Sequence, residues 1–210
     1  MKSVGFKEWS LVCDALGRGE QSIILRKGGS AEGRSGFSFR YHEFFLFPTF
    51  FHAQTGKVRD RRQENRIGEQ SAKALIRTFS RGEKGLLAAR QNRSTRNGEI
   101  VILLYAKVER AVRIDSLVTA EAFAPLHVLV PEVVRERFGY NGEGLNVAFV
   151  RVFRLEREWA FPNEKRFGGC RSWVDLPEAP ELEMQAVIND VAFANCRAKF
   201  DAIVSSSRTE

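Results

Sequence analysis

The sequence predicts an α+β fold with a curved or barrel-like, mixed and largely antiparallel sheet and flanking helices. Residues 99–108 are apolar at consecutive positions from 100 to 106, which indicates a central strand covered on both faces. Residues 145–155, with the sequence LNVAFVRVFRL, have the β-branched and aromatic content of a second long strand. Strand and helix patterns follow one another without regular alternation, which favours this fold class over a doubly wound parallel sheet.

The N-terminal part contains several shorter candidate strands. Residues 6–16 have apolar side chains at both helical and strand spacings, so they form either a short helix or a strand that enters a hairpin. Residues 22–26 are β-branched and predict a strand. Residues 35–41 alternate aromatic and polar side chains, as a strand with one buried face does, and residues 43–51 follow as a more continuously buried strand. These last two strands could pair as a hairpin around Phe44.

Helical patterns lie mainly in the second half of the chain. We expect helices over residues 67–79 and 116–123, and another at the end of the chain over residues 180–204. The segment PEVVRERFG has proline at the favoured first helical position, Pro131, and glycine at its end, Gly139. The boundaries of that helix are therefore well defined by the sequence.

The length of 210 residues and the apolar content of 43% suit one substantial core. We predict a single α+β core domain over residues 1–176 and a C-terminal helical extension over residues 177–210. No repeat of 20 to 50 residues is visible, which disfavours a solenoid.

The net charge of +7 is unevenly distributed. Residues 1–113 hold 22 Lys and Arg against 11 Asp and Glu, whereas residues 114–210 hold 11 against 15. A positive half beside a mildly negative half favours a polyanionic partner at the N-terminal part. The alternative is an arginine-rich but functionally neutral surface.

Several sequence features concern the cellular environment. The longest apolar runs are far shorter than the roughly 20 residues that span a bilayer, and the N-terminal MKSVGFKEWS lacks the apolar core of a secretion signal. We therefore expect a cytoplasmic protein without a membrane partner. Three widely spaced cysteines, Cys13, Cys170 and Cys196, form neither a disulfide framework nor a C-x-x-C zinc spacing. No metal or cofactor is predicted, and the oligomeric state stays open.

Basic residues gather around a glycine pair and in two later segments. Glycines allow backbone N–H groups to turn toward a phosphate while arginine and lysine neutralise it; the alternative is a hairpin turn with charged flanks. The predicted nucleic-acid-binding residues are Arg26, Lys27, Gly28, Gly29, Arg34, Arg59, Arg61, Arg62 and Arg171.

A second hypothesis places catalysis among four residues near the same loop, namely Glu32, His42, Glu43 and His52. An acid/base pair or a metal held by the histidines and a carboxylate would suit a phosphodiesterase or a nucleotide-processing enzyme. The chain lacks the P-loop, G-x-S-x-G and H-E-x-x-H motifs, and no lysine follows an acidic residue at the spacing of restriction-like nucleases. Histidines held by local hydrogen bonds are the structural alternative.

Four segments carry a resemblance to a known family: KEW at residues 7–9, LRKGG at residues 25–29, FLFPT at residues 45–49 and GCRSW at residues 169–173. With the flanking sequence they resemble a prokaryotic family classed as a domain of unknown function. That family implies no activity. The order of strands and helices after residue 100 is also similar to PUA-like small barrels, including ASCH and EVE modules, which implies RNA or modified-base binding by analogy of fold.

The prediction is therefore a nucleic-acid-binding module, RNA ahead of DNA, that uses its basic N-terminal half. Phosphate contacts of this kind give affinity with little sequence preference. Whether the protein is an enzyme stays open at this point. A structural module that binds a protein partner through an apolar patch is a third possibility.

Overall fold

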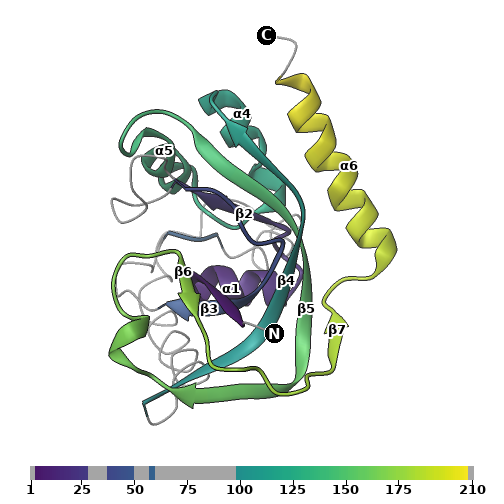
Figure 1. Cartoon of the computed structure of the whole chain (residues 1–210). Helices are drawn as coiled ribbons and strands as arrows, with labels where there is room; N and C mark the ends of the chain where they lie inside the picture. Colours follow the sequence, from purple (N-terminus) through teal and green to yellow (C-terminus); the bar gives the residue numbers. More distant parts are fainter. Residues whose placement is uncertain (1–2, 28–36, 50–56, 60–97, 208–210) are drawn as a thin grey trace, which may run out of the picture.

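The protein is built on one curved, seven-stranded sheet, seen in a computed structural model that describes residues 3–27, 37–49, 57–59 and 98–207 (Figure 1). Along the sheet the order is β2-β5-β4-β3-β1-β6, and β7 pairs with β5. Only β1 and β3 are parallel among the described pairs. The predicted α+β class with a mixed, largely antiparallel sheet is confirmed. The strands are β1 (Val4–Trp9), β2 (Ile23–Arg26), β3 (Glu43–Thr49), β4 (Glu99–Ile114), β5 (Leu145–Pro162), β6 (Trp173–Asp175) and β7 (Met184–Ala186).

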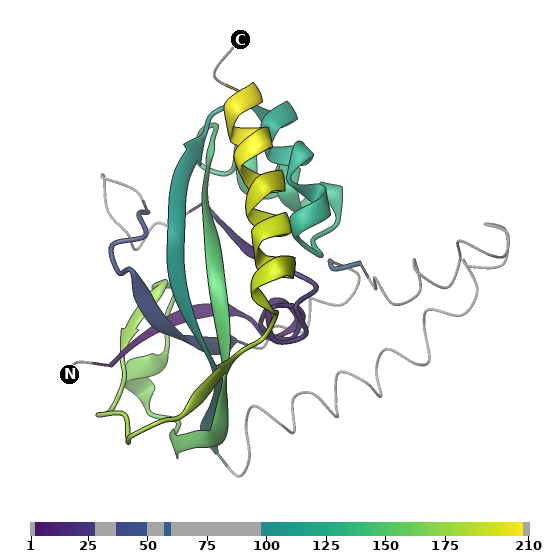
Figure 2. The same cartoon turned by 90° about the vertical axis from the view of Figure 1, so that its right-hand side faces the viewer.

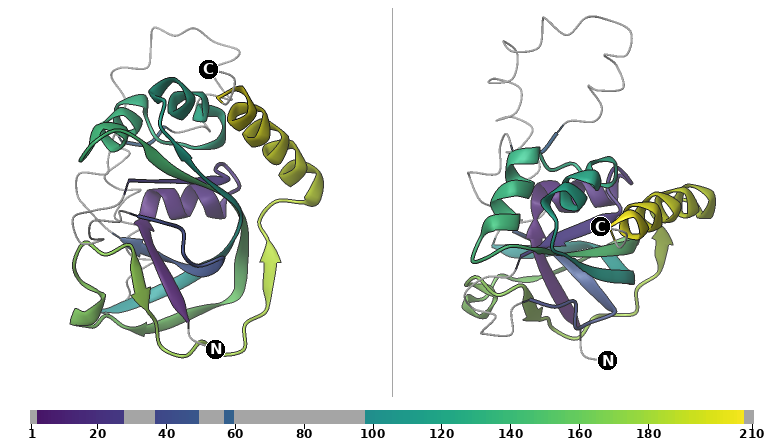
Figure 3. Two further views of the ribbon diagram at one scale, coloured as in Figure 1. Left: turned by 45° about the horizontal axis from the view of Figure 1, so that its top comes forward. Right: turned by 90° about the horizontal axis from the view of Figure 1, so that it is seen from above.

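Helices flank this sheet and fill its curve. Helix α1 is almost wholly buried and lies inside the curve of the sheet (Figure 3). Helix α5 begins at Pro131 and ends at Gly139, as predicted, and the hydroxyl of Ser116 caps α4 by accepting a hydrogen bond from the Thr119 N–H. The helices are α1 (Ser10–Gly17), α4 (Leu117–Ala122), α5 (Pro131–Gly139) and α6 (Asp190–Ser206), with short 3₁₀ turns η4 (Ala124–Leu126) and η5 (Lys165–Phe167).

The curvature comes from the two longest strands, β4 and β5, which have 16 and 18 residues. Their register shifts between Ile102 and Leu104 and again between Val108 and Arg110. Such bulges bend a strand and increase its twist. The first shift also changes the buried face, because Ile102 belongs to one core cluster and Leu104 to the other.

The buried apolar side chains form two core clusters. The larger core is covered by α1, α4, α5 and α6 and includes consecutive residues of β2 and β5, so it takes side chains from both faces of these strands; the smaller core is covered by the chain from η5 to residue 182. Strand β1 borders both cores because alternate side chains point to opposite faces. Its Phe6 packs in the larger core, whereas Lys7 lies over Phe47 of the smaller core.

Several expected local elements differ in the structure. The segment 6–16 contains both candidate elements in succession, since β1 leads directly into α1. The prediction of a strand over residues 35–41 is wrong for residues 37–41, the part of this range that the structure describes, because they form no strand. The expected hairpin around Phe44 is wrong as well, because β3 pairs with β1 and β4.

The physical reason for this difference is that aromatic packing takes the place of strand pairing. Phe37 and Phe39 lie with their ring centroids 6.0 and 5.9 Å from that of Phe6, and 4.8 Å from each other. Alternating aromatic residues therefore reach the core from an irregular segment. The predicted helix over residues 67–79 lies outside the described residues.

The C-terminal helix α6 packs along β5 and α4 (Figure 2). The buried residues of this helix are Phe193, Phe200 and Val204, and the ring of Phe200 lies 5.3 Å from those of Phe123 and Phe149. Helix α6 thus contributes to the larger core, and the predicted domain boundary at residue 176 stays a prediction. None of the helices in the described ranges is both long and apolar enough to cross a membrane.

The three cysteines differ in burial, which predicts different reactivity toward a thiol reagent. Burial raises the pKa of the Cys13 thiol well above 9.0, so this group keeps its proton and stays inert in the folded protein. Cys170 is exposed. We expect iodoacetamide at pH 8 to modify Cys170 first and Cys13 only after unfolding, as measured by peptide mass spectrometry. Modification of Cys13 in the folded protein as fast as that of Cys170 would contradict this burial.

Candidate functional site

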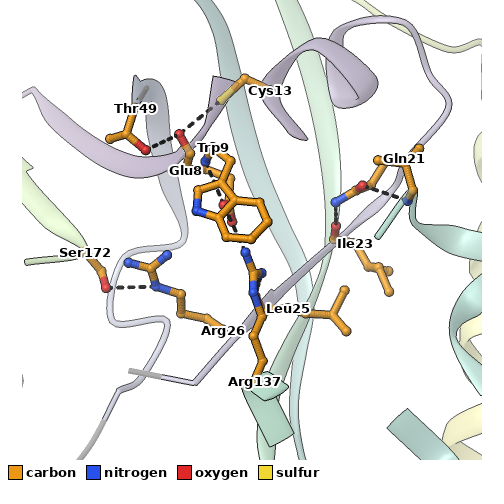
Figure 4. Close-up of polar contacts among 11 residues, drawn as sticks. Glu8, Trp9, Cys13, Gln21, Ile23, Leu25, Arg26, Thr49, Arg137 and Ser172 are labelled. Atoms are coloured by element: carbon orange, nitrogen blue, oxygen red, sulfur yellow. Dashed lines mark hydrogen bonds and ion pairs between the residues drawn. The ribbon is translucent and has the colours of Figure 1, made fainter. Parts of the chain in front are cut away.

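The two ends of the strand order approach each other where β2 faces β1 and the residues before β6. Here Arg26 Nε donates a hydrogen bond to Ser172 Oγ at 3.1 Å (Figure 4). No backbone pairing joins β2 to β1 or β6 in the described residues. Side chains therefore bridge this opening in the sheet. We call this place the seam and define it by Glu8, Arg26, Arg137 and Ser172.

The central group of the seam is the carboxylate of Glu8, whose side chain is 0% exposed. Its Oε1 accepts a hydrogen bond from the Trp9 N–H at 2.7 Å, and Arg137 Nη2 lies 3.7 Å from the same oxygen. The other oxygen, Oε2, is buried without a hydrogen-bond partner among the described residues. A buried polar atom without a partner costs about 1–3 kcal/mol, more for a charged group. Half of this carboxylate is thus left unsatisfied.

Helix α5 supplies Arg137 to the seam. Its Nη1 donates to the Leu25 carbonyl of β2 at 2.7 Å, and its guanidinium carbon lies 4.4 Å from the centroid of the Trp9 ring, as Figure 4 shows. Burial lowers the pKa of Arg137 and the charge of Glu8 opposes that effect, while the guanidinium keeps its proton in any case. Arg137 therefore joins a helix and two strands through one charged group.

A second guanidinium, that of Arg26, lies next to this pair. Besides its bond to Ser172, it lies with its guanidinium carbon 5.4 Å from the centroid of the Phe6 ring. None of the described carboxylates lies within ion-pair distance of it. The seam thus holds two guanidinium groups and one carboxylate, and only Arg137 lies within ion-pair distance of that carboxylate, so the partly buried seam carries an excess of positive charge.

Further cations lie around the seam. Lys7, on the opposite face of β1, donates from Nζ to the carbonyls of Gly168 and Gly169, both at 3.0 Å. Burial lowers its pKa most; the charges of Arg26 and Arg171 lower it further, while Cys170 raises it. The proximity of these charges shows that Arg171, which is exposed, belongs to the same positive region.

An aromatic surface adjoins the seam on the side of β6. The guanidinium carbon of exposed Arg40 lies 5.2 Å from the centroid of the Tyr41 ring, and Tyr41 packs edge-on against Trp173 at 4.9 Å. The indole Nε1 of Trp173 is buried without a hydrogen-bond partner among the described residues. Stacked cation and ring pairs of this kind can accept a nucleic-acid base on their outer side.

The arginines near α6 behave differently, because each has a carboxylate partner. Arg110 lies 2.5 Å from Asp201, Arg151 lies 2.6 Å from Asp190, and Arg197 pairs with Glu109. Their charges are largely neutralised within the protein. The contrast indicates that the cations of the seam region, rather than those of the α6 face, are available to an anionic partner.

The predicted binding residues that the structure describes make different contacts. Arg26 lies in the seam and Arg171 beside it. Lys27 donates to the carbonyls of Phe138, Gly142 and Gly144, and so holds the end of α5 against the start of β5. Arg59 donates to the carbonyls of Ala124 and His127 at 2.7 and 2.8 Å. The other predicted residues, Gly28, Gly29, Arg34, Arg61 and Arg62, lie outside the described residues.

Two of the four catalytic candidates, His42 and Glu43, can be located. His42 is exposed immediately before β3, and Glu43 at the start of β3 lies 3.6 Å from Lys107. Burial and a hydrogen bond to Glu43 raise the pKa of Tyr105. Glu32 and His52 lie outside the described residues, and no group of three or more potential metal ligands occurs within the described part.

Glu8, Trp9 and Arg137 were not among the residues singled out from the sequence. Two signals could have identified them. Glu8 is an acidic residue inside the otherwise buried strand β1, and Arg137 lies at helical spacing from Val133 and Val134, on the apolar side of α5. A charged side chain on a buried face needs an oppositely charged partner. Glu8 therefore predicts a buried cation, and Arg137 predicts a buried carboxylate.

Comparisons with known proteins were made for the whole chain. A search of curated proteins found no match. Among solved structures, the ASCH protein from Zymomonas mobilis is 11% identical, with a TM-score of 0.46 over 84% of this chain and 89% of that chain. Two point variants of that protein have the same TM-score, with 10% and 11% identity; they cover 84% and 85% of this chain, and 89% and 92% of theirs. The model of the family described as Domain of unknown function (DUF1802) matches residues 5–199, so the chain belongs to that family.

Proposed function

We propose that the protein is a nucleic-acid-binding module whose contact surface is the seam and the cations around it. The observation that carries this proposal is that Arg26, Arg40 and Arg171 have no carboxylate partner among the described residues, whereas the arginines of the α6 face are paired. Unpaired guanidinium groups beside an aromatic surface suit phosphates and stacked bases together. A surface selected only for solubility does not require unpaired arginines on one side of the protein and paired arginines on another.

The chemistry of the seam favours a single strand over a duplex. A guanidinium next to Phe6 and a second one on Trp9 lie partly below the surface, where a phosphate of a rigid duplex has limited reach. A flexible strand can direct a phosphate inward while its bases lie on aromatic rings. We propose RNA ahead of DNA as the natural ligand, and the binding assay includes both.

The test is the salt dependence of binding by fluorescence anisotropy, with labelled single- and double-stranded RNA and DNA. We expect Arg26→Ala combined with Arg171→Ala to weaken binding about tenfold at low salt and to reduce the slope of log K against log salt by about 1 to 2. Binding through fewer phosphate contacts releases fewer counterions from the nucleic acid, so the slope decreases. Parallel gels would reveal cleavage, the result expected of the enzyme hypothesis.

The matched control is Arg110→Ala combined with Arg197→Ala. It removes the same charge from the α6 face, where both residues have carboxylate partners. We expect this variant to keep the slope within experimental error. Equal slopes for wild type and the Arg26 and Arg171 variant would remove the seam from the interface.

A further inference from the structure

The unsatisfied oxygen of Glu8 provides information about the ligand beyond its charge. Buried carboxylates in folded proteins are normally satisfied by several hydrogen bonds, and an exception requires an explanation. Glu8 Oε2 lies in the seam, on the carboxylate that pairs with Arg137, yet no described group donates to it. Because a carboxylate only accepts hydrogen bonds, the missing partner must be a donor.

A second unsatisfied atom lies on the same face of the sheet. Strand pairing places Trp173 opposite Phe6, and Glu8 is two residues further along β1, so the side chains of Glu8 and Trp173 leave the sheet on one side. Trp173 Nε1 is a buried donor without a partner in the described residues. An unsatisfied acceptor and an unsatisfied donor thus lie on one face of the sheet.

The seam can admit such a group without breaking backbone hydrogen bonds. Within the described ranges, side chains alone bridge β2 to the other end of the sheet, through the bond of Arg26 to Ser172 before β6 and through the contacts of Arg137 with Leu25 and with Glu8 of β1. Side chains change rotamer much faster than paired strands separate. A ligand therefore needs to displace one arginine to reach Glu8 Oε2.

Electrostatics excludes the simplest candidates for this position. The phosphodiester group of a nucleic-acid backbone has only acceptor oxygens and would be repelled by Glu8, so it suits Arg26 but not the unsatisfied oxygen. A divalent cation would suit Glu8 but would meet two guanidinium charges. A neutral group with an N–H donor fits Glu8, and an anion attached to that group fits Arg26.

We propose that Glu8 recognises the base of one nucleotide by accepting a single N–H hydrogen bond at Oε2, while Arg26 binds a phosphate of the same strand. This inference rests on the proposed nucleic-acid binding and identifies the base as the part of the nucleotide that the seam recognises. Bases have N–H donors on their Watson–Crick edges, and carboxylates accept from them in other complexes. The protein thus distinguishes a base-bearing strand from its bare sugar-phosphate backbone.

The experiment compares two labelled single-stranded RNA hexamers of equal charge, one complete and one abasic at its central positions. We expect the wild type to bind the complete hexamer about tenfold more tightly. Glu8→Gln should lower this ratio, because a neutral amide oxygen is a weaker acceptor than a carboxylate oxygen. It should leave the salt slope unchanged, because no phosphate contact is lost. Glu109→Gln, which removes a carboxylate from the α6 face, should keep the wild-type ratio.

The outcomes separate this inference from the proposed function. Equal binding of both hexamers by the wild type would overturn the role of Glu8, with a water molecule as the partner of Oε2, and would leave nucleic-acid binding in place. Absence of binding to either hexamer at low salt would overturn the proposed function itself. The wild-type comparison needs no variant, so equal binding overturns the role of Glu8 even if Glu8→Gln fails to fold. A wild-type preference that Glu8→Gln leaves unchanged would assign the preference to stacking on the aromatic surface and would also overturn that role.

Discussion

Replacing Arg137 by alanine is expected to lower the free energy of unfolding by about 3–5 kcal/mol, the usual cost of leaving one buried charge without its partner. The Glu8 carboxylate is wholly buried, and Arg137 is the described cation within 4 Å of it. The substitution also removes the hydrogen bond to the Leu25 carbonyl and the contact with Trp9. Urea denaturation followed by circular dichroism measures the loss.

The same helix provides a matched control in Arg135. Its side chain is 54% exposed and pairs with Glu121 and Glu132 at the surface. Exposed ion pairs contribute about 0–1 kcal/mol, so we expect Arg135→Ala to change stability by no more than that. Equal effects of the two substitutions would mean that the seam pair behaves as a surface pair.

A double variant identifies the origin of the loss. Apolar replacements of a buried ion pair are often neutral or stabilising, because both desolvation costs disappear together. We therefore expect Glu8→Leu combined with Arg137→Met to recover most of the stability that Arg137→Ala loses. Such a variant would fold and lack the proposed recognition of a base. No recovery would show that hydrogen bonds and packing of Arg137, rather than charge, stabilise the seam.

Replacing Phe200 by alanine has the second large expected effect, a loss of about 3–5 kcal/mol. The side chain is 0% exposed and contacts Phe123 and Phe149, which come from the larger core. Removing it leaves a cavity lined by aromatic rings that cannot easily collapse. Thermal and urea denaturation measure the loss, and one cooperative transition should remain because α6 unfolds with the sheet.

The control for this prediction is Val191→Ala near the start of the same helix. Val191 is 72% exposed, so its substitution should change stability by about 0.5 kcal/mol or less. A small effect of Phe200→Ala, or a separate early transition, would instead support an independent C-terminal extension after residue 176. The experiment thus tests the predicted domain boundary as well as the packing of α6.

Elements with strong local signals could be predicted from the sequence. The helix from Pro131 to Gly139 has its start and stop residues in the sequence, and β4 and β5 have long apolar patterns that no helix would show. That Arg26 binds an anion stays a prediction, made from its basic, glycine-rich surroundings. These conclusions rest on contacts between near neighbours in the chain.

Elements that depend on distant contacts could not be predicted in this way. Residues 37–41 have the alternation of a strand, yet the aromatic rings of this segment pack on Phe6 without strand pairing. The parallel pairing of β1 with β3 depends on which strands meet across the sheet. Local periodicity shows which side chains are buried and says little about the partner that buries them.

The sequence by itself determined the fold class, the two long strands, the helix α5 and the positive charge of the N-terminal half, because each follows from local pattern or composition. The seam was decided only by the tertiary structure. Glu8, Arg26 and Arg137 are separated by many residues, and bulged strands bring them together by curving the sheet until its two ends meet. Burial then makes three ordinary charged residues a candidate site, since a charge acquires its large energetic cost and its specificity only after water is removed.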